Sequence, residues 1–370
     1  MSDSAAPPPA TPFADDQPPR PPLSEVFLAF VQVSVSGLGG ALPWARRMIV
    51  ERKRWMTAEE FNEAFSLSQF LPGPNTVNFS VVFGSRFGGA AGAAVALIGL
   101  MGPPLIIVTM LAVLYAQFGD LETLGRILKG IAAAAAGLLI AVVAKMAAPL
   151  FTVRWNSGPV IAILAFTGIA ITQWPLPYVF LTLANQHRAG LVQAMNNDSP
   201  LLTLFGYFAL LSLFAVGGAN AAIPEMHRVA VDVMGWMTSR QFADMFAISQ
   251  LSPGPNVIIV TLIGYHVAGL MGATVATAAM VGPTCVMAFF VTRFWDRFKH
   301  ARWRIAVQTG LVPVSLGLIG ASAFLLARAA DNTIMAGVLT AATVVVAFFS
   351  RINPLWLFLA GGLLGLTGWL

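Results

Sequence analysis

Charged residues and cysteine are scarce in this chain of 370 residues. Only 10% of the residues are charged, against about 25% in soluble domains, while 57% are hydrophobic. These proportions exclude an ordinary soluble enzyme and favour an integral membrane protein. The single cysteine, Cys285, excludes an internal disulfide and a two-cysteine redox centre, and the four histidines form no cluster that suggests a metal. No cofactor is therefore expected.

Basic residues give the chain a formal net charge of +5, and they lie in short loops between apolar segments. This distribution follows the positive-inside rule for membrane proteins. It favours the lipid bilayer as the surroundings of the protein, and it does not indicate a nucleic-acid partner.

Apolar stretches follow one another from Leu23 to the C-terminus. Residues 1–22 are rich in proline and are expected to form a disordered tail without a cleavable signal peptide. Helices satisfy the backbone in lipid, so the expected fold class is an all-α integral membrane bundle. Three stretches, 64–84, 243–264 and 353–370, are polar, broken or short, and are expected to enter the membrane and return. The apolar stretches lie near 25–43, 64–84, 88–118, 130–150, 159–183, 200–223, 243–264, 267–292, 305–327, 333–350 and 353–370.

The chain contains an internal repeat. Residues 55–75 (WMTAEEFNEAFSLSQFLPGPN) and 236–256 (WMTSRQFADMFAISQLSPGPN) are identical at eleven of twenty-one positions, with a constant offset of 181. Further glycine and proline residues match on both sides of this box. These matches predict two homologous halves, 23–185 and 199–370, joined by a polar linker at 186–198.

The loop charges predict how the two halves are oriented. Loop 44–63 holds five Lys/Arg and loop 119–129 holds two, whereas the corresponding loops 225–242 and 293–304 hold two and five. Short loops rich in Lys/Arg stay in the cytoplasm, so equivalent loops are expected on opposite sides of the membrane. The pattern favours inverted repeats with broken helices, which is the architecture of many secondary transporters. A parallel duplication with drifting charges remains the alternative.

A Pro-Gly-Pro-Asn sequence interrupts an apolar stretch in each half, at 72–75 and 253–256. The prolines remove backbone donors and the glycine is permissive, so the helix is expected to stop there. Each asparagine is expected to cap the next helix, whose free N–H groups would face the break and bind an oxyanion. Gln69 and Gln250, six residues before each asparagine, add side-chain donors. A simple kink or turn is the alternative.

Other residues at membrane depth extend this candidate site. Two glycine pairs, at 39–40 and 217–218, either let the backbone unwind beside the substrate or permit close helix packing. Arg86, the counterpart of His266, is either an anion attractor or an interface arginine. Glu225 is expected to be a solvated loop carboxylate, with proton coupling as its alternative role, and Lys145 is expected to snorkel. The candidate substrate-binding residues are Gly39, Gly40, Gln69, Pro72, Gly73, Pro74, Asn75, Thr76, Arg86, Gly217, Gly218, Gln250, Pro253, Gly254, Pro255, Asn256, Val257 and His266.

These features resemble the chromate ion transporter (CHR) family in its long-chain, two-repeat form. The resemblance rests on the paired glycines with a following proline, the basic loop ending in Trp-Met-Thr, the box F-x-x-x-F-S-L-S-Q-F-L-P-G-P-N and the later Gly-Pro pair, and it covers residues 23–370. It implies proton-driven export of chromate from the cytoplasm across the inner membrane, chromate resistance, and competition by sulfate. The second half departs from the family pattern at 219–223, where three extra residues precede Pro224.

Composition and spacing alone predict only an anion transporter with inverted repeats. The alternatives are a transporter of sulfate or another oxyanion without a resistance role, and a membrane-embedded enzyme. The enzyme is disfavoured because the chain has one cysteine, no nucleotide-binding motif and no Ser, His or Asp cluster that forms a nucleophile–base pair. Assembly as a homodimer stays open.

Overall fold

The computed structural model describes residues 21–37, 41–152, 158–172, 199–215, 217–298, 302–350 and 352–370. Every regular element in these ranges is a helix, which confirms the all-α prediction. Within them, four helices are long and apolar enough to cross a membrane, namely α4 (Asn75–Phe118), α5 (Glu122–Thr152), α12 (Ile259–Phe298) and α13 (Arg302–Ala330). The other helices are α1 (Leu23–Ser36), α2 (Ala41–Arg46), η1 (Arg47–Arg52), α3 (Ala58–Phe70), α6 (Gly158–Ala170), α9 (Pro200–Phe214), α10 (Ala219–His227), η2 (Arg228–Val233), α11 (Ser239–Leu251), η3 (Asn256–Ile258), α14 (Ile334–Phe349) and α15 (Pro354–Leu366).

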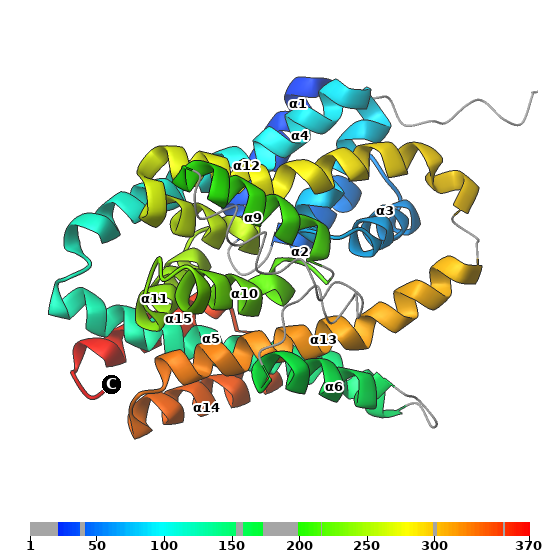
Figure 1. The fold of residues 1–370 in the computed structure, drawn as a ribbon. Coiled ribbons are helices and arrows are strands. Elements are labelled where there is room, and N and C mark those ends of the chain that lie inside the picture. Colours follow the sequence, from blue (N-terminus) through cyan, green and yellow to red (C-terminus); the bar gives the residue numbers. More distant parts are fainter. Residues whose placement is uncertain are drawn as a thin grey trace, which may run out of the picture.

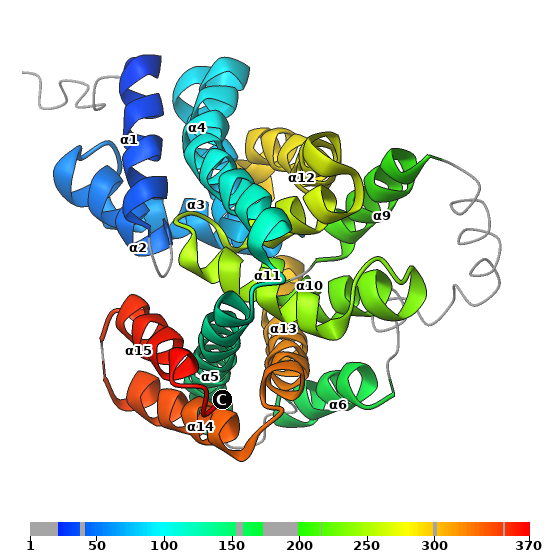
Figure 2. The ribbon, with the colours of Figure 1, turned by 90° about the vertical axis from the view of Figure 1, so that its left-hand side faces the viewer.

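The helices form two layers with shorter helices between them (Figure 2). One layer contains α1, α4, α9 and α12, and the other contains α5, α6, α13, α14 and α15. Helices α10 and α11 lie between the layers, where α10 packs on α13 and α11 packs on α5. The buried residues Ala132 to Ala136 on α5 have small side chains, so α14 and α15 pack closely against this helix.

Helix α4 is bent back on itself. Its backbone leaves the helical conformation at Gly88 and Gly89. The bend presses Gly84 against Gly92 so closely that a Cβ atom on Gly84 would lie 2.2 Å from the carbonyl oxygen of Gly92. A straight helix would hold these two residues about 12 Å apart. Helix α4 therefore consists of a short first limb, 75–87, and a long second limb, 90–118.

Helix α12 repeats this bend in the second half of the chain. Its backbone leaves the helical conformation at Ala268 and Gly269. The hydroxyl groups of Thr261 and Thr277 are hydrogen-bonded at 2.8 Å across the bend. The first limb of α12 is 259–267 and the second is 270–298. The second limbs of α4 and α12 run through the length of the molecule, and α4 ends at the opposite end from α12 (Figure 1).

Helix α3 and the first limb of α4 form a helical hairpin whose tip is residues 71–74. The Phe61 and Phe79 rings are 4.9 Å apart between centroids, and Glu60 at the start of α3 forms an ion pair with Arg86 near the end of the limb. The two segments are therefore antiparallel. Helix α3 has 13 residues, so its length is about 20 Å. The hairpin is too short to cross a hydrocarbon core of about 30 Å.

The second half contains the corresponding hairpin, formed by α11 and the first limb of α12 around residues 252–255. His266 near the end of that limb lies 3.1 Å, measured at Nε2, from the carbonyl oxygen of Trp236, which precedes α11. Its two segments are also antiparallel and short. Both Pro-Gly-Pro-Asn sequences thus stand at the tips of hairpins that enter the helix bundle and return.

The first apolar stretch of each half also folds back. In the first half, Lys53 after η1 forms an ion pair of 2.8 Å with Glu25 near the start of α1. In the second half, the Tyr207 hydroxyl on α9 donates a hydrogen bond of 3.0 Å to the carbonyl oxygen of Glu225 on α10. The chain reverses after Ser36 in one half and after Phe214 in the other.

Candidate functional site

The first hairpin tip meets the glycine pair of the second half in the middle of the bundle. The backbone N–H of Gly73 donates a hydrogen bond of 2.9 Å to the carbonyl oxygen of Ala215. A Cβ atom on Gly218 would lie 3.2 Å from Nδ2 of Asn75, so the backbone at Gly218 lies directly against this amide. The structure thus brings together candidate residues from both halves.

The second hairpin tip reaches the same segment a few residues further along the chain. Nδ2 of Asn256 donates a hydrogen bond of 3.3 Å to Oδ1 of Asn220, the second residue of α10. The carbonyl oxygen of Asn220 accepts a hydrogen bond of 2.6 Å from the hydroxyl of Ser322 on α13. Ala215, Gly218 and Asn220 therefore contact the two tips, Ala215 and Gly218 at the first and Asn220 at the second.

A small cavity of about 100 Å³ lies beside the second tip. Three of the candidate residues, Gln250, Gly254 and Asn256, line it. Asn220, Ser249 and Ser252 add polar groups to the same wall, and the opposite wall includes side chains of α5 and Phe358 of α15. This cavity is the candidate functional site.

The prediction that Asn75 and Asn256 cap their helices is wrong. Pro74 and Pro255 occupy the N-cap positions with extended backbones, so each asparagine is already the first helical residue. Proline has a φ close to that required and no N–H to satisfy, and it therefore takes over the boundary. The amide of each asparagine is consequently available for contacts across the break, with Gly218 in one case and Asn220 in the other.

The free N–H groups expected after each break are fewer than the sequence suggested. The backbone N–H of Asn78 bonds to the carbonyl oxygen of Pro74, and that of Ile258 bonds to the carbonyl oxygen of Pro255. The side chain of Asn78 is fully buried, and its Nδ2 donates to the carbonyl oxygen of Pro72 at 2.8 Å, which closes the first tip. Thr76 and Val257 are the candidate residues that follow each asparagine in the turn beside the break.

Several candidate residues lie away from the central cavity. Arg86 and His266 stand at the far ends of the first limbs, where Arg86 is paired with Glu60 and His266 contacts the backbone of Trp236. Gln69 is exposed near the end of α3. Gly39 and Gly40 lie outside the described residues.

Two charged residues considered from the sequence have defined partners. Glu225 is 7% exposed, which contradicts the expected solvated loop carboxylate. Its carboxylate accepts two hydrogen bonds, 2.9 and 2.6 Å long, from the guanidinium of Arg228 one helical turn later. Lys145 on α5 donates to the carbonyl oxygen of Ala347 on α14 at 2.7 Å. Lys145 is exposed at the outside of the bundle, and whether it snorkels to the membrane surface stays a prediction.

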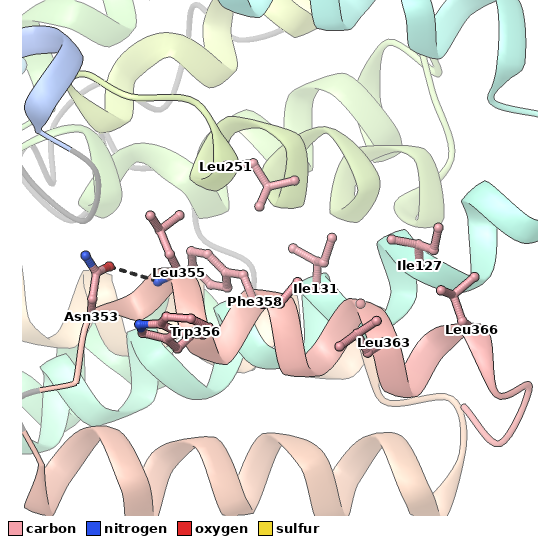
Figure 3. Close-up of a pocket in the computed structure, with 11 residues that line it drawn as sticks. Ile127, Ile131, Leu251, Asn353, Leu355, Trp356, Phe358, Leu363 and Leu366 are labelled. Carbon is pink, nitrogen blue, oxygen red and sulfur yellow. Dashed lines mark hydrogen bonds between the residues drawn. The ribbon is translucent and has the colours of Figure 1, made fainter.

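An apolar groove of about 550 Å³ lies between α5, α15 and the end of α11 (Figure 3). Ile127, Ile131 and Leu251 reach into it from one side, and side chains of α15 form the other. Phe358 also lines the smaller polar cavity, so this ring separates the two spaces. Asn353 and Trp356 are the polar side chains in this lining and the others are apolar, so a dianion would lose more hydration in the groove than these donors replace.

The sequence analysis missed two groups that the structure makes conspicuous. Asn220 belongs to the three-residue insertion before Pro224, and this departure from the repeat was its signal. Asp244 on α11 is 5% exposed and accepts a hydrogen bond of 3.0 Å from the Tyr115 hydroxyl on α4. Its signal was the repeat itself, because the offset of 181 pairs Asp244 with Glu63 in the middle of the shared box.

The fold and the central polar site define a multi-pass membrane protein whose helices are interrupted in the middle of the bundle. The model of the chromate transporter family matches residues 24–186 and again 202–366, so the chain belongs to this family and contains its unit twice. No solved structure matches the chain.

Curated relatives resemble the chain over nearly its whole length. A chromate transport protein of Pseudomonas aeruginosa is 29% identical and aligns with 95% of this chain and 93% of its own. A chromate transport protein of Cupriavidus metallidurans is 25% identical, with coverage of 94% and 93%. An uncharacterised transporter of Methanocaldococcus jannaschii is 26% identical over 76% of this chain and 78% of its own.

Proposed function

We propose that this protein exports chromate from the cytoplasm across the inner membrane by proton-coupled secondary transport, and that it thereby confers chromate resistance. Its family and the names of its relatives support chromate as the substrate. The observation that carries the proposal is the small polar cavity at the second hairpin tip, lined by Gln250, Gly254 and Asn256.

The lining of this cavity suits an oxyanion. The side-chain amides of Gln250 and Asn256 supply neutral donors, and none of the described residues that line the cavity is acidic. The hydroxyls of Ser249 and Ser252 donate to backbone carbonyl oxygens, so they add polar oxygen atoms to the lining. Neutral donors near a helix N-terminus stabilise a dianion without trapping it in a strong ion pair. A volume of about 100 Å³ equals about three water molecules at about 30 Å³ each. Such a space suits a small tetrahedral oxyanion, and sulfate is expected to compete because it has the same shape and charge.

We further propose that the halves 23–185 and 199–370, joined by the linker 186–198, are inverted repeats. Reciprocal contacts agree with a two-fold relation between the halves, which inverted and parallel repeats share. Gly73 packs on Thr284, the residue after the Gly-Pro pair of the second half, and Gly254 packs on Pro104 at the equivalent place in the first half. Residues 119–122 line one cavity together with Thr238, Arg240 and Gln241, and both segments belong to loops with few basic residues, which agrees with a common side for both loops.

Thiol labelling tests the orientation. Single cysteines introduced into 44–63, 119–129, 225–242 and 293–304 after Cys285→Ser would be probed in intact cells with a membrane-impermeant reagent. We expect labelling at 119–129 and 225–242 only. Labelling of 44–63 and 225–242 from the same side would refute the inverted arrangement.

Flux through purified protein tests the transport proposal. Proteoliposomes would be given an imposed pH gradient with the membrane potential clamped, and uptake of radiolabelled chromate and sulfate would be followed. We expect chromate to accumulate only when a pH gradient is present, and excess sulfate to reduce this uptake. Accumulation of sulfate alone would favour a sulfate transporter without a resistance role. Accumulation of chromate that ignores the pH gradient would refute proton coupling.

Substitutions at the cavity test the site. Gln250→Ala and Asn256→Ala should weaken chromate binding, because each removes a donor to a charged ligand, which is worth about 1.5–3 kcal/mol, or about tenfold or more in affinity. Asn75→Ala and Gln69→Ala should have smaller effects, since neither residue lines this cavity. Asn62→Ala, an exposed amide on α3, is the matched control. Wild-type affinity in monodisperse Gln250→Ala and Asn256→Ala proteins would remove the second tip from the substrate site.

A further inference from the structure

A buried carboxylate lies between the two halves, at the end of the molecule where α4 ends and α11 begins. Asp244 comes from the hairpin of the second half, and its hydrogen-bond donor Tyr115 comes from the second limb of α4 in the first half. The bond is 3.0 Å long and the Asp244 residue is 5% exposed. Among the described residues, no basic side chain is within ion-pair distance of this carboxylate. A buried carboxylate held by one neutral donor is suited to gain and lose a proton.

A polar cavity of about 470 Å³ connects this carboxylate with the end of the bundle. Asp244 lines this cavity together with residues 119–122, Thr238, Arg240 and Gln241. A polar cavity of this size has room for water beside the carboxylate. The titratable and charged groups around Asp244 are Tyr115 of α4, Asp120 of the following loop, Glu122 and Lys129 of α5, Arg240 of α11, and Tyr265 and His266 of α12. These groups come from every helix packed around the carboxylate.

The position of Asp244 also suits a coupling between proton binding and anion transport. The Asp244–Tyr115 hydrogen bond joins the hairpin that carries the second Pro-Gly-Pro-Asn tip to a long helix of the other half. A charged carboxylate repels an oxyanion, and a protonated one does not. The protonation state of Asp244 therefore changes both the contact between the halves and the electrostatic potential in the polar cavity that Asp244 lines.

We propose that Asp244 carries the proton that is exchanged for chromate, and that Tyr115 positions its carboxylate. In each cycle the carboxylate binds one proton from water in the polar cavity, forming a neutral carboxylic acid, and releases that proton on the cytoplasmic side. No other bond is made or broken. This inference rests on the proposed function, in which transport is proton-coupled and loops 119–129 and 225–242 face outward.

The test compares two modes of transport in proteoliposomes. Chromate uptake into vesicles with an acidic interior requires coupled proton efflux, whereas exchange of labelled for unlabelled chromate at equal pH requires no net proton movement. Asp244→Asn should reduce pH-driven uptake to the level of protein-free vesicles while exchange continues at a rate close to wild type. Asp244→Glu should restore pH-driven uptake in part. Asp120→Asn, an exposed carboxylate on the rim of the same cavity, is the matched control and should retain both modes.

Each result decides between distinct explanations. If wild-type protein shows no pH-driven uptake, the proposed proton coupling is wrong. If the pH gradient drives chromate uptake equally well in the wild type and in Asp244→Asn, Asp244 does not carry the proton. Loss of both modes in monodisperse Asp244→Asn protein would also overturn the inference, because the residue would then be needed for translocation itself.

Tyr115→Phe provides a second test if Asp244→Asn fails to fold. This change keeps the carboxylate but removes the donor that stabilises its charged form. The pH at which driven uptake is half-maximal should then move upward by about one unit, the equivalent of one hydrogen bond to a charged group. An unchanged pH profile would contradict the positioning role of Tyr115 and, with it, the assignment of Asp244.

Discussion

Replacing Gly254 by alanine should disturb the contact between the two halves at the second hairpin tip. Gly254 has a φ of +115°, a conformation that L-residues other than glycine rarely adopt. A Cβ atom there would lie 2.5 Å from Cγ and 2.7 Å from Cβ of Pro104 on α4. The new methyl group therefore meets both backbone strain and a rigid ring.

The magnitude follows from these two effects. Backbone strain at a positive φ costs about 1–3 kcal/mol, and overpacking a close contact costs about 1–3 kcal/mol. Gly254→Ala should therefore lower the free energy of unfolding by about 2–6 kcal/mol, the sum of both costs. Gly73→Ala should behave alike, because Gly73 has a φ of +88° and its Cβ would lie 2.6 Å from Oγ1 of Thr284.

Thermal unfolding of the purified protein, followed by size-exclusion chromatography of heated samples, measures this effect. Gly102→Ala and Gly282→Ala are the controls, because a Cβ at either position has no neighbour within 4 Å. Alanine is the better helix former, so these variants should be as stable as wild type or slightly more stable. Thr284→Ala should rescue Gly73→Ala in part, by removing the clash but leaving the backbone strain. A Gly254→Ala protein with the wild-type unfolding temperature would refute the argument.

Two further predictions concern carboxylates outside the central cavity, of which Asp331 is partly buried and Glu225 is buried. Burial raises the pKa of Asp331, in the loop between α13 and α14, although the hydrogen bond of 2.7 Å from the Thr340 hydroxyl opposes the shift. The charged carboxylate therefore destabilises the fold at pH values above the folded-state pKa, and it has no effect below the pKa of the unfolded state. Asp331→Asn should unfold at a higher temperature than wild type at pH 7–8. This difference should vanish below about pH 4, where the wild-type carboxyl group is protonated in both states. Arg228→Ala should lower the free energy of unfolding by about 3–5 kcal/mol, because it leaves Glu225 buried and unpaired. In the same unfolding assay, the double variant Glu225→Gln, Arg228→Met should be more stable than Arg228→Ala. The opposite order of stability would contradict the pairing.

The positions of the helix breaks could be predicted from the sequence because they depend on local chemistry. Proline removes a backbone donor wherever it stands, so the interruptions at 72–75 and 253–256 were visible without a structure. The polar residues Arg86 and His266 likewise divided the stretches 64–84 and 243–264 from those that follow, close to the bends of α4 and α12. The predicted capping role of the asparagines is wrong because proline and asparagine both favour a helix start. The sequence does not distinguish which of the two is the boundary residue, and the backbone conformation does.

Whether a segment crosses the membrane or returns could not be read from composition. The first apolar stretch, 25–43, is long enough to cross, yet the chain turns after Ser36 and η1 returns to the level of Glu25. Other helices cover a limb that enters the bundle and returns, so its sequence is as apolar as the sequence of a helix that crosses the membrane. Asp244 was missed for the same reason. In the sequence, Asp244 is one polar residue among others in a helix. Only the fold places Tyr115, which is 129 residues earlier in the sequence, against its carboxylate.

The two halves differ at their hairpin tips, and this difference bears on the proposed substrate site. A duplicated sequence would place two equivalent sites about a symmetry axis, with one at each hairpin tip. The second half instead carries three extra residues before Pro224, and Asn220 in this insertion holds Asn256 at the edge of the small cavity. At the first tip, Asn75 is packed against Gly218, and the Asn78 side chain closes the break through the carbonyl oxygen of Pro72. Because the described part of the first tip is packed against protein groups while the second tip opens on a cavity, we propose that the substrate binds at the second tip.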